Sequence, residues 1–275
     1  SRNGMRCILE GVHRAMPAKQ PRQRSRWHLA RAHHADEVRA RLESEGGGGH
    51  LGDAVLGAID GGITSFAVVA GAVGGGFSSL VVIILGVASL LADGFSMAVS
   101  NYLGTKSDAQ AADQAHREEL RHIEEIPEHE CAELREVFSA KGFEGETLDR
   151  IVETLAADPE LWAKTITQEE FGLQPGDTGQ PLQSGAATFA AFVLVGAIPL
   201  IPFAVPALSL EQAFIASIVA TSLAFLGVGI TKGWALDQSR FRSGLETLLI
   251  GSGAAVLAYG AGFLLRTWLG TGAVA

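Results

Sequence analysis

Four side chains with an oxygen, nitrogen or sulfur atom recur at every fourth position. They lie within and just before an apolar stretch, LLADGFSMAVSN at residues 90–101. They are Ser89, Asp93, Met97 and Asn101. Residues four apart lie on one face of an α-helix, so a hydroxyl, a carboxylate, a thioether and an amide would form one stripe. Carboxylate oxygen supplies negative charge, and a soft sulfur ligand discriminates against Mg²⁺ and Ca²⁺. The pattern favours a path for a borderline-soft divalent cation.

A second carboxylate, Asp60, lies in GAIDGG, where the flanking glycines permit close helix approach or a local break. Asp53, seven residues earlier, shares its face of the predicted helix. Ionisable groups at membrane depth are costly and mark pathways, so they usually face a cavity or a partner. The plainer alternatives are that Met97 fills a gap in the core and that Asp93 is a protonated carboxyl bonded to neighbouring backbone. The predicted transport path consists of Asp60, Asp93, Met97 and Asn101.

An acidic segment carries a second candidate site. Glu119-x-x-His122 places a carboxylate and an imidazole one helical turn apart, as helical metal sites often do. Hard carboxylates with one imidazole suit Fe²⁺, Mn²⁺ or Zn²⁺, and the spacing does not choose among them. The alternative is a solvated, salt-bridged helix surface. The predicted metal ligands are Glu118, Glu119, His122, Glu125, Glu130, Glu133, Glu169 and Glu170.

Long apolar helices must position these groups. The chain has 275 residues, of which 47% are hydrophobic and only 19% charged, and its mean hydropathy is +0.23. It is too apolar for an ordinary soluble protein of this size. A membrane span needs about 20 mostly apolar residues, which makes buried helices of a soluble core the poorer alternative. We predict five transmembrane helices, at about 53–73, 78–101, 186–206, 210–231 and 245–267.

Charge is segregated along the chain. Residues 1–41 hold ten Lys or Arg against three acidic residues, whereas residues 104–177 hold nineteen Asp or Glu against seven Lys or Arg. By the positive-inside rule the N-terminal tail and the 232–242 loop are cytoplasmic, and topology places the acidic segment on the same side. The tail is expected to be disordered and to lie partly on anionic lipid rather than to be a cleaved signal peptide.

Apolar stripes predict that the acidic segment is helical. Pro127 would stop an extension of the second span, and Asp158-Pro159 is a helix start signal. The fold class is therefore all-α: a polytopic membrane protein with a small cytoplasmic helical domain inserted between helices two and three. The predicted domains are a basic tail (1–50), transmembrane helices one and two (51–101), the acidic metal-binding domain (102–177) and transmembrane helices three to five (178–275).

Two stretches carry a resemblance to a known family. AVLGAIDGGITSFAVVAG followed by LLADGFSMAVSNYLGTKSD resembles the first two helices of the vacuolar iron transporter (nodulin-like) family, and the likeness runs from about Leu51 to Arg266. The resemblance implies a homodimeric exchanger that moves Fe²⁺, and often Mn²⁺, out of the cytoplasm against protons. It implies that Asp60 and Met97 line the path. It also implies ion-gathering glutamates, matched here by Glu119, Glu130, Glu133 and Glu170.

The chain departs from that family's plant pattern at three positions. His122 stands where a further glutamate is expected, Ile166 where a methionine ligand is expected, and Ser89 where helix two carries a glutamate. Asp93, one turn after Ser89, is expected to take over that carboxylate's task.

The sequence thus favours a secondary transporter rather than an enzyme. We expect insert carboxylates to concentrate the ion, and protons to compete with it in the path. Fe²⁺, Mn²⁺ or Zn²⁺ is the transported ion, and no permanently bound cofactor is expected. The alternatives are a membrane-anchored, ferritin-like di-iron oxidase, for which a second Glu-x-x-His is missing, and a metal-sequestering or sensing protein. A bacterial inner membrane is the expected location. We expect the chain to form a homodimer in the lipid bilayer and not to bind nucleic acid.

Overall fold

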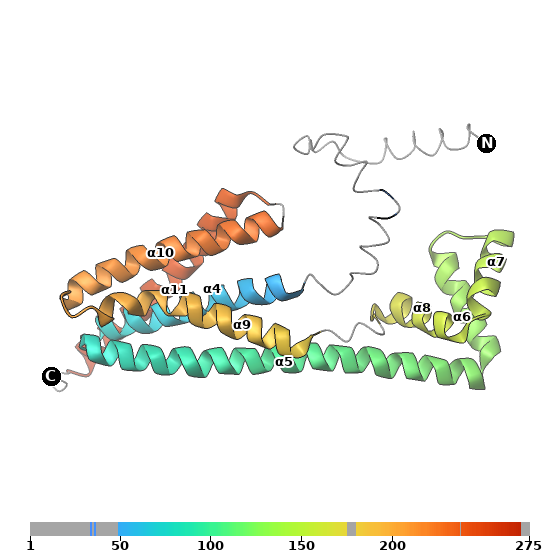
Figure 1. The fold of residues 1–275 in the computed structure, drawn as a ribbon, viewed down its shortest axis with the longest axis horizontal. Coiled ribbons are helices and arrows are strands. Elements are labelled where there is room, and N and C mark those ends of the chain that lie inside the picture. Colours follow the sequence, from blue (N-terminus) through green and yellow to red (C-terminus); the bar gives the residue numbers. More distant parts are fainter. Residues whose placement is uncertain (1–33, 35, 37–48, 175–179, 237, 271–275) are drawn as a thin grey trace. The chain divides into compact units, whose positions relative to one another are not determined.

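The computed structural model describes residues 34, 36, 49–174, 180–236 and 238–270. The chain divides into two units, Ser1–Glu45 and Gly46–Ala275, and the helices whose bounds follow belong to the second. Most of the predicted basic tail falls outside the described residues. Every regular element with bounds in the described ranges is a helix (Figure 1), which confirms the all-α fold class.

The first two helices form an antiparallel hairpin in the order that the sequence predicts. α4 spans Gly49–Gly74 and α5 spans Ser79–Glu125. In the turn between them Gly76 has a φ of 79°, a left-handed conformation that favours glycine. α5 continues past its apolar half as one helix of 47 residues. It ends where Pro127, which lacks an N–H, opens the next helix.

The remaining helices of the bundle follow the insert. α9 spans Pro181–Gly196 and continues into the 3₁₀ helix η1, Ile198–Ala204, across a 42° bend. α10 spans Leu210–Ala235 and starts with a capping box, and α11 spans Arg240–Trp268. Among the described residues four helices are long and apolar enough to cross a membrane, and the bent pair α9 and η1 passes the same test together, as a broken span or a re-entrant loop. These findings confirm a polytopic membrane protein, and the prolines of η1 explain the bend.

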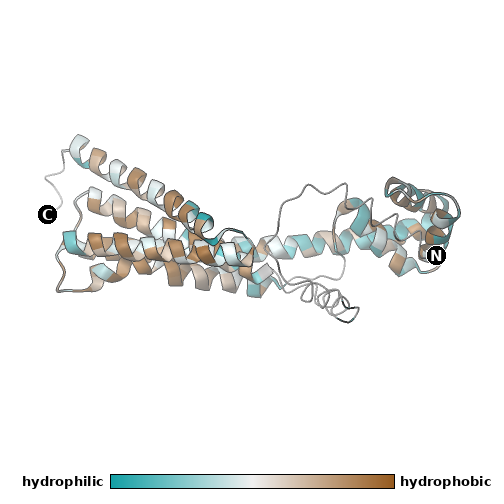
Figure 2. Cartoon of the chain, turned by 90° about the horizontal axis from the view of Figure 1, so that it is seen from above, coloured by the Kyte–Doolittle hydropathy of each residue, from teal (hydrophilic) through white to brown (hydrophobic). Residues whose placement is uncertain are grey.

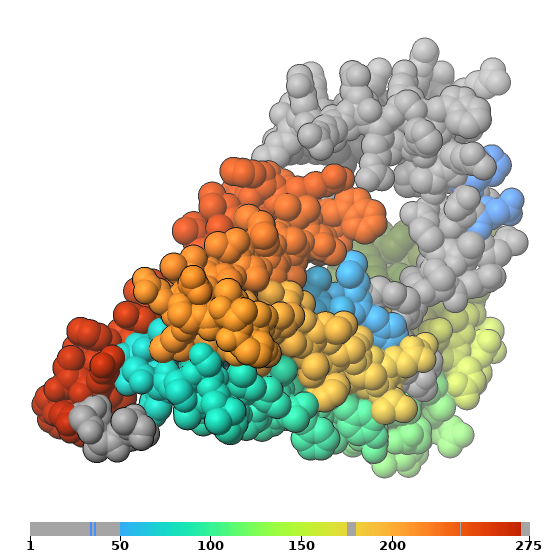
Figure 3. Space-filling model, turned by 60° about the vertical axis from the view of Figure 1, so that its left-hand side comes forward, coloured from blue at the N-terminus to red at the C-terminus, as the bar shows by residue number. Residues whose placement is uncertain are grey.

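α4 lies inside the bundle, in contact with α5, α9, α10 and α11. Glycines bring it against α9: a Cβ atom at Gly57 would lie 2.3 Å from the carbonyl oxygen of Thr188, and one at Gly61 would lie 2.3 Å from that of Phe192. Phe192 is fully buried in the core that these helices share. In Figure 3 the first half of α5, α9 and α10 run along one face of this bundle.

The insert between α5 and α9 consists of three short helices. α6 spans Pro127–Ala140, α7 spans Gly145–Ala156 and α8 spans Pro159–Phe171. Asp158 caps α8 as predicted, accepting hydrogen bonds from the backbone N–H groups of two following residues. Figure 2 shows mostly apolar colouring over the bundle and mostly hydrophilic colouring on the outer half of α5 and the insert. The insert's own core contains Ile123, Leu134, Leu148, Val152, Trp162, Ala163 and Ile166.

Candidate metal centre and membrane path

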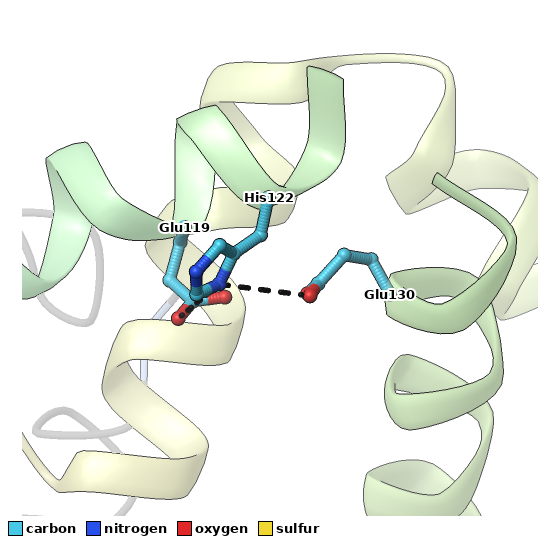
Figure 4. Close-up of side chains that lie close together, drawn as sticks. All are labelled: Glu119, His122 and Glu130. Carbon is cyan, nitrogen blue, oxygen red and sulfur yellow. Dashed lines mark ion pairs between the residues drawn. The ribbon is translucent and has the colours of Figure 1, made fainter. Parts of the chain in front are cut away.

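The structure brings three predicted ligands together where α5 meets α6. Glu119 and His122 lie one turn apart near the end of α5, and Glu130 lies in the first turn of α6 because Pro127 turns the chain back. His122 Nδ1 is 3.8 Å from Glu119 Oε1 and 3.7 Å from Glu130 Oε1. Figure 4 shows the three side chains converging on one space between the two helices. Their ligand atoms are close enough to hold one metal ion.

The two carboxylates of this centre are buried, and one oxygen of each has no hydrogen-bond partner among the described residues. Glu119 is 5% exposed and Glu130 is 4% exposed. Neither Glu119 Oε2 nor Glu130 Oε2 has a hydrogen-bond partner among the described residues. Buried charges are normally paired or coordinate a metal, because leaving them unpaired costs several kcal/mol. A divalent cation would satisfy both oxygens, and two carboxylates with one imidazole form a donor set that first-row metals accept.

Burial and the neighbouring negative charges raise the pKa of Glu119, which lies on α5 beyond the apolar half of the helix. The pKa of Glu119 is raised to about 7, chiefly by burial and next by the neighbouring Glu130 carboxylate, while His122 acts in the opposite direction. At neutral pH a proton therefore competes for the Glu119 carboxylate in the absence of a metal. A metal ion that binds there must displace this proton.

Glu133 and Glu170 extend the centre. Burial raises the pKa of Glu133, on α6, to about 7, and a hydrogen bond and charge repulsion from Glu170, on α8, act in the same direction. Glu130 and Glu119 add to this repulsion, so the four carboxylates act on one another across three helices. Ile166, where the family resemblance leads one to expect a methionine ligand, is fully buried in the apolar core of the insert.

Three predicted ligands lie outside this group. Glu118 is exposed and accepts a hydrogen bond from Gln114 Nε2 at 3.2 Å. Glu169 forms an ion pair with Lys141. Glu125 is exposed at the last residue of α5. These three glutamates match the alternative of a solvated, salt-bridged surface better than that of a ligand.

Within the apolar helices, Asp60 and Asp93 lie on a surface of the single chain. Both are exposed, and their carboxylates are close enough to interact electrostatically. Ser89 Oγ donates a hydrogen bond of 2.5 Å to Asp93 Oδ2. In the single chain Asp93 is therefore exposed, and its partner among the described residues is the Ser89 hydroxyl. Met97 is half-buried against the core that contains Phe192, so its thioether also contributes to packing.

Asn101, the last member of the predicted stripe, joins three helices. Its Nδ2 donates to Asp53 Oδ1 on α4 at 2.9 Å and to Thr188 Oγ1 on α9 at 2.8 Å, and lies 3.3 Å from the backbone oxygen of Ser184. For Asp53, the first of these partners, the sequence carries a signal: it lies seven residues before Asp60 and so on the same face of α4. No signal marks Thr188, because its role depends on α9 lying beside α5.

The sequence of this chain is similar to those of a known protein family. The sequence model of the VIT family matches residues 51–263. The chain is 34% identical over 208 residues to vacuolar iron transporter 1 of Eucalyptus grandis, covering 76% of this chain and 83% of that protein. It is 34% identical over 212 residues to vacuolar iron transporter 2 of Oryza sativa subsp. japonica, covering 76% and 84%. It is 29% identical over 224 residues to the vacuolar iron transporter of Toxoplasma gondii (strain ATCC 50861 / VEG), covering 78% and 74%.

Proposed function

This chain belongs to the VIT family, and from that premise we propose that it exports Fe²⁺, and also Mn²⁺, from the cytoplasm in exchange for protons. The family and the names of its relatives indicate a multi-pass membrane transporter and not an enzyme. The relatives' names specify iron. The choice of ions, the exchange and the direction are the proposal.

One observation carries it: the paired carboxylates of Asp60 and Asp93 on the apolar halves of α4 and α5. Charged groups at membrane depth are rare, and they face a protein partner or a water-filled cavity rather than acyl chains. Here both side chains are exposed in the single chain. We therefore propose a homodimer in which a second copy covers this face and encloses a shared path.

The chemistry of that path fits a transition-metal dication. Two carboxylates supply oxygen ligands and negative charge, and the half-buried Met97 thioether lies one turn beyond Asp93 on α5. Sulfur is a poor ligand for Mg²⁺ and Ca²⁺, so it favours Fe²⁺ or Mn²⁺ over these abundant ions. Because carboxylates bind either a proton or a metal, entry of the ion releases protons, and protonation from the far side releases the ion.

The insert centre has a collecting role in this proposal. Glu119 and His122 lie on α5, the helix that carries Asp93 and Met97, and Glu130 faces them from α6. The charge pattern favours a cytoplasmic insert, and the resemblance favours a bacterial inner membrane. The relatives carry the word vacuolar in their names.

Counterflow in proteoliposomes tests the proposal. The unsubstituted chain should exchange Fe²⁺ and Mn²⁺ and should exclude Ca²⁺, and each metal flux should be matched by an opposing proton flux reported by an internal pH dye. Asp60→Ala should abolish both fluxes, whereas Glu211→Ala, at an exposed acidic position in the first turn of α10, should leave them intact. Metal flux without proton flux would contradict the exchange, and full flux in Asp60→Ala would contradict the path.

A further inference from the structure

A histidine and an aspartate in the first turns of α4 form a pair that the path described above does not use. His50 and Asp53 lie three residues apart, and His50 Nδ1 is 3.9 Å from Asp53 Oδ2. This separation is too long for a hydrogen bond. His50 Nδ1 is itself buried and has no hydrogen-bond partner among the described residues. The two atoms therefore lie within ion-pair distance but share no hydrogen bond.

The carboxylate of this pair is held in place from the other side. Its second oxygen, Asp53 Oδ1, accepts the 2.9 Å hydrogen bond from Asn101 Nδ2, and Asn101 also donates to Thr188 Oγ1. Thr188 is fully buried, and its hydroxyl in turn bonds the backbone oxygen of Ser184 at 2.9 Å. Three helices thus fix one oxygen of Asp53 and leave the other directed at His50. Carboxylates that bind metals are commonly oriented in this way by a hydrogen-bond partner.

The spacing of the two free atoms is that of two ligands of one ion. Metal–nitrogen and metal–oxygen bonds of about 2.1 Å allow two ligand atoms of the same ion to lie up to about 4 Å apart. The insert centre has the same geometry, with His122 Nδ1 at 3.8 Å and 3.7 Å from its two carboxylate oxygens. Imidazole and carboxylate together select first-row dications rather than Ca²⁺ or Mg²⁺.

The position along the helices suggests what the pair serves. Asp53 precedes Asp60 by two helical turns on the same face of α4, and its partner Asn101 follows Met97 by one turn on α5. An ion that travels from the insert to Asp60 and Asp93 would meet His50 and Asp53 first. This step rests on the proposed transport function.

We propose that His50 and Asp53, oriented by Asn101, form a further binding site for a divalent transition-metal ion at the mouth of the membrane path. Water completes the coordination. Asn101 acts as a positioning residue that keeps Asp53 turned toward the ion. The site gives the path an imidazole ligand, which neither the pair Asp60 and Asp93 nor Met97 supplies.

Pulsed EPR of bound Mn²⁺ tests the site, because electron spin echo modulation detects a coordinated imidazole nitrogen. The full chain in nanodiscs would carry His122→Ala, which removes the imidazole of the insert centre. This variant should still show nitrogen modulation, and adding His50→Ala should remove it. His129→Ala, at an exposed histidine on α6, is the matched control and should leave the modulation unchanged.

The affinity for Mn²⁺ gives a second test, in variants that leave the His50 imidazole unchanged. Asp53→Asn and Asn101→Ala, each in the His122→Ala background, should weaken Mn²⁺ binding at this site by at least about tenfold. In proteoliposomes the same two changes should raise the KM for Mn²⁺ more than they lower the maximal flux. A purely structural role for Asn101 would lower the melting temperature without changing the affinity of the folded protein.

The outcomes separate this inference from the proposed function. Absence of nitrogen modulation in His122→Ala, or modulation that survives His50→Ala, overturns the site whether or not the protein transports metal. Absence of flux in the unsubstituted chain overturns the transport proposal, while the spectra still decide whether the site exists.

Discussion

At the residue scale, the insert centre is defined by two buried carboxylates, each with one oxygen that lacks a hydrogen-bond partner among the described residues, rather than by the number of acids. The sequence identifies the Glu-x-x-His pair, because i and i+3 positions must lie together on a helix. It does not separate Glu130 and Glu133 from Glu118, Glu125 and Glu169. That separation depends on how α6 and α8 pack against the end of α5, which local spacing does not encode.

The raised pKa values predict that metal binding by the insert depends on pH. Glu119 and Glu133 have pKa values of about 7, and each must be deprotonated to bind a metal. The affinity of the full chain for Mn²⁺ should therefore fall as the pH is lowered through 7, by about tenfold per pH unit for each proton displaced. Titrations followed by the EPR signal of free Mn²⁺ would measure this.

The control for that titration is a neighbour of the centre. Glu130→Gln removes a ligand and should weaken binding at every pH, whereas Glu128→Gln changes an exposed residue of the same helix and should have little effect. An affinity that stays constant or rises toward acidic pH would be incompatible with proton displacement from these glutamates.

Met97 can be assigned by a substitution that keeps its volume. Met97→Leu preserves the packing against the core, so it should cost less than about 1.5 kcal/mol of stability. It removes the sulfur, so Fe²⁺ flux in proteoliposomes should be lost if the thioether is a ligand. Leu90→Met, the reverse exchange in the same core, should retain flux. Normal flux in Met97→Leu would show that the residue only fills space.

At the element scale, the apolar spans are predictable because charge-free runs of this length have few other uses. The bend after α9 is predictable too, since Pro199 and Pro202 interrupt the helix. The partners of Asn101 are not, because they come from α4 and α9 and depend on which helices lie side by side. Glycine positions in α4 are a partial guide to this packing, although only the structure distinguishes those in contact from those facing open space.

Two glycines of α4 give a matched test of that packing. A Cβ at Gly61 would lie 2.3 Å from the Phe192 carbonyl oxygen, whereas a Cβ at Gly52 would meet nothing within 4 Å. Gly61→Ala should therefore destabilise the detergent-solubilised protein by about 1–3 kcal/mol. Gly52→Ala should be neutral or stabilise it by up to about 1 kcal/mol. Thermal unfolding would measure both, and equal melting temperatures would refute the close approach of α4 to α9.

At the scale of the whole molecule, the exposed carboxylates of Asp60 and Asp93 mark the face that a second copy would cover in the proposed homodimer. The resemblance suggested a homodimer, and the position of Asp60 and Asp93 indicates which face would form it. Composition alone could not have identified this face, since both helices are apolar over most of their circumference.

Cross-linking at single cysteines would locate the interface. In a chain with Cys7→Ser and Cys131→Ser, Leu56→Cys lies one turn before Asp60 and should form cross-linked dimers in membranes. Leu257→Cys lies on α11, and its residue is more exposed, at 76% against 52% for Leu56. It should remain monomeric if that surface faces lipid. Efficient cross-linking at Leu257 with none at Leu56 would place the interface elsewhere.

The unbroken length of α5 has a consequence for how an ion arrives. Glu119 follows Met97 by about six helical turns, which places the two about 33 Å apart along one rod. No side chain spans this distance. While α5 stays straight, an ion therefore cannot pass directly from the ligands around Glu119 to Met97. One ion confined to a hemisphere of that radius corresponds to an effective concentration on the order of 20 mM at the mouth of the path. The insert would then work as a reservoir that feeds the entrance by short-range diffusion, and its release rate would limit delivery.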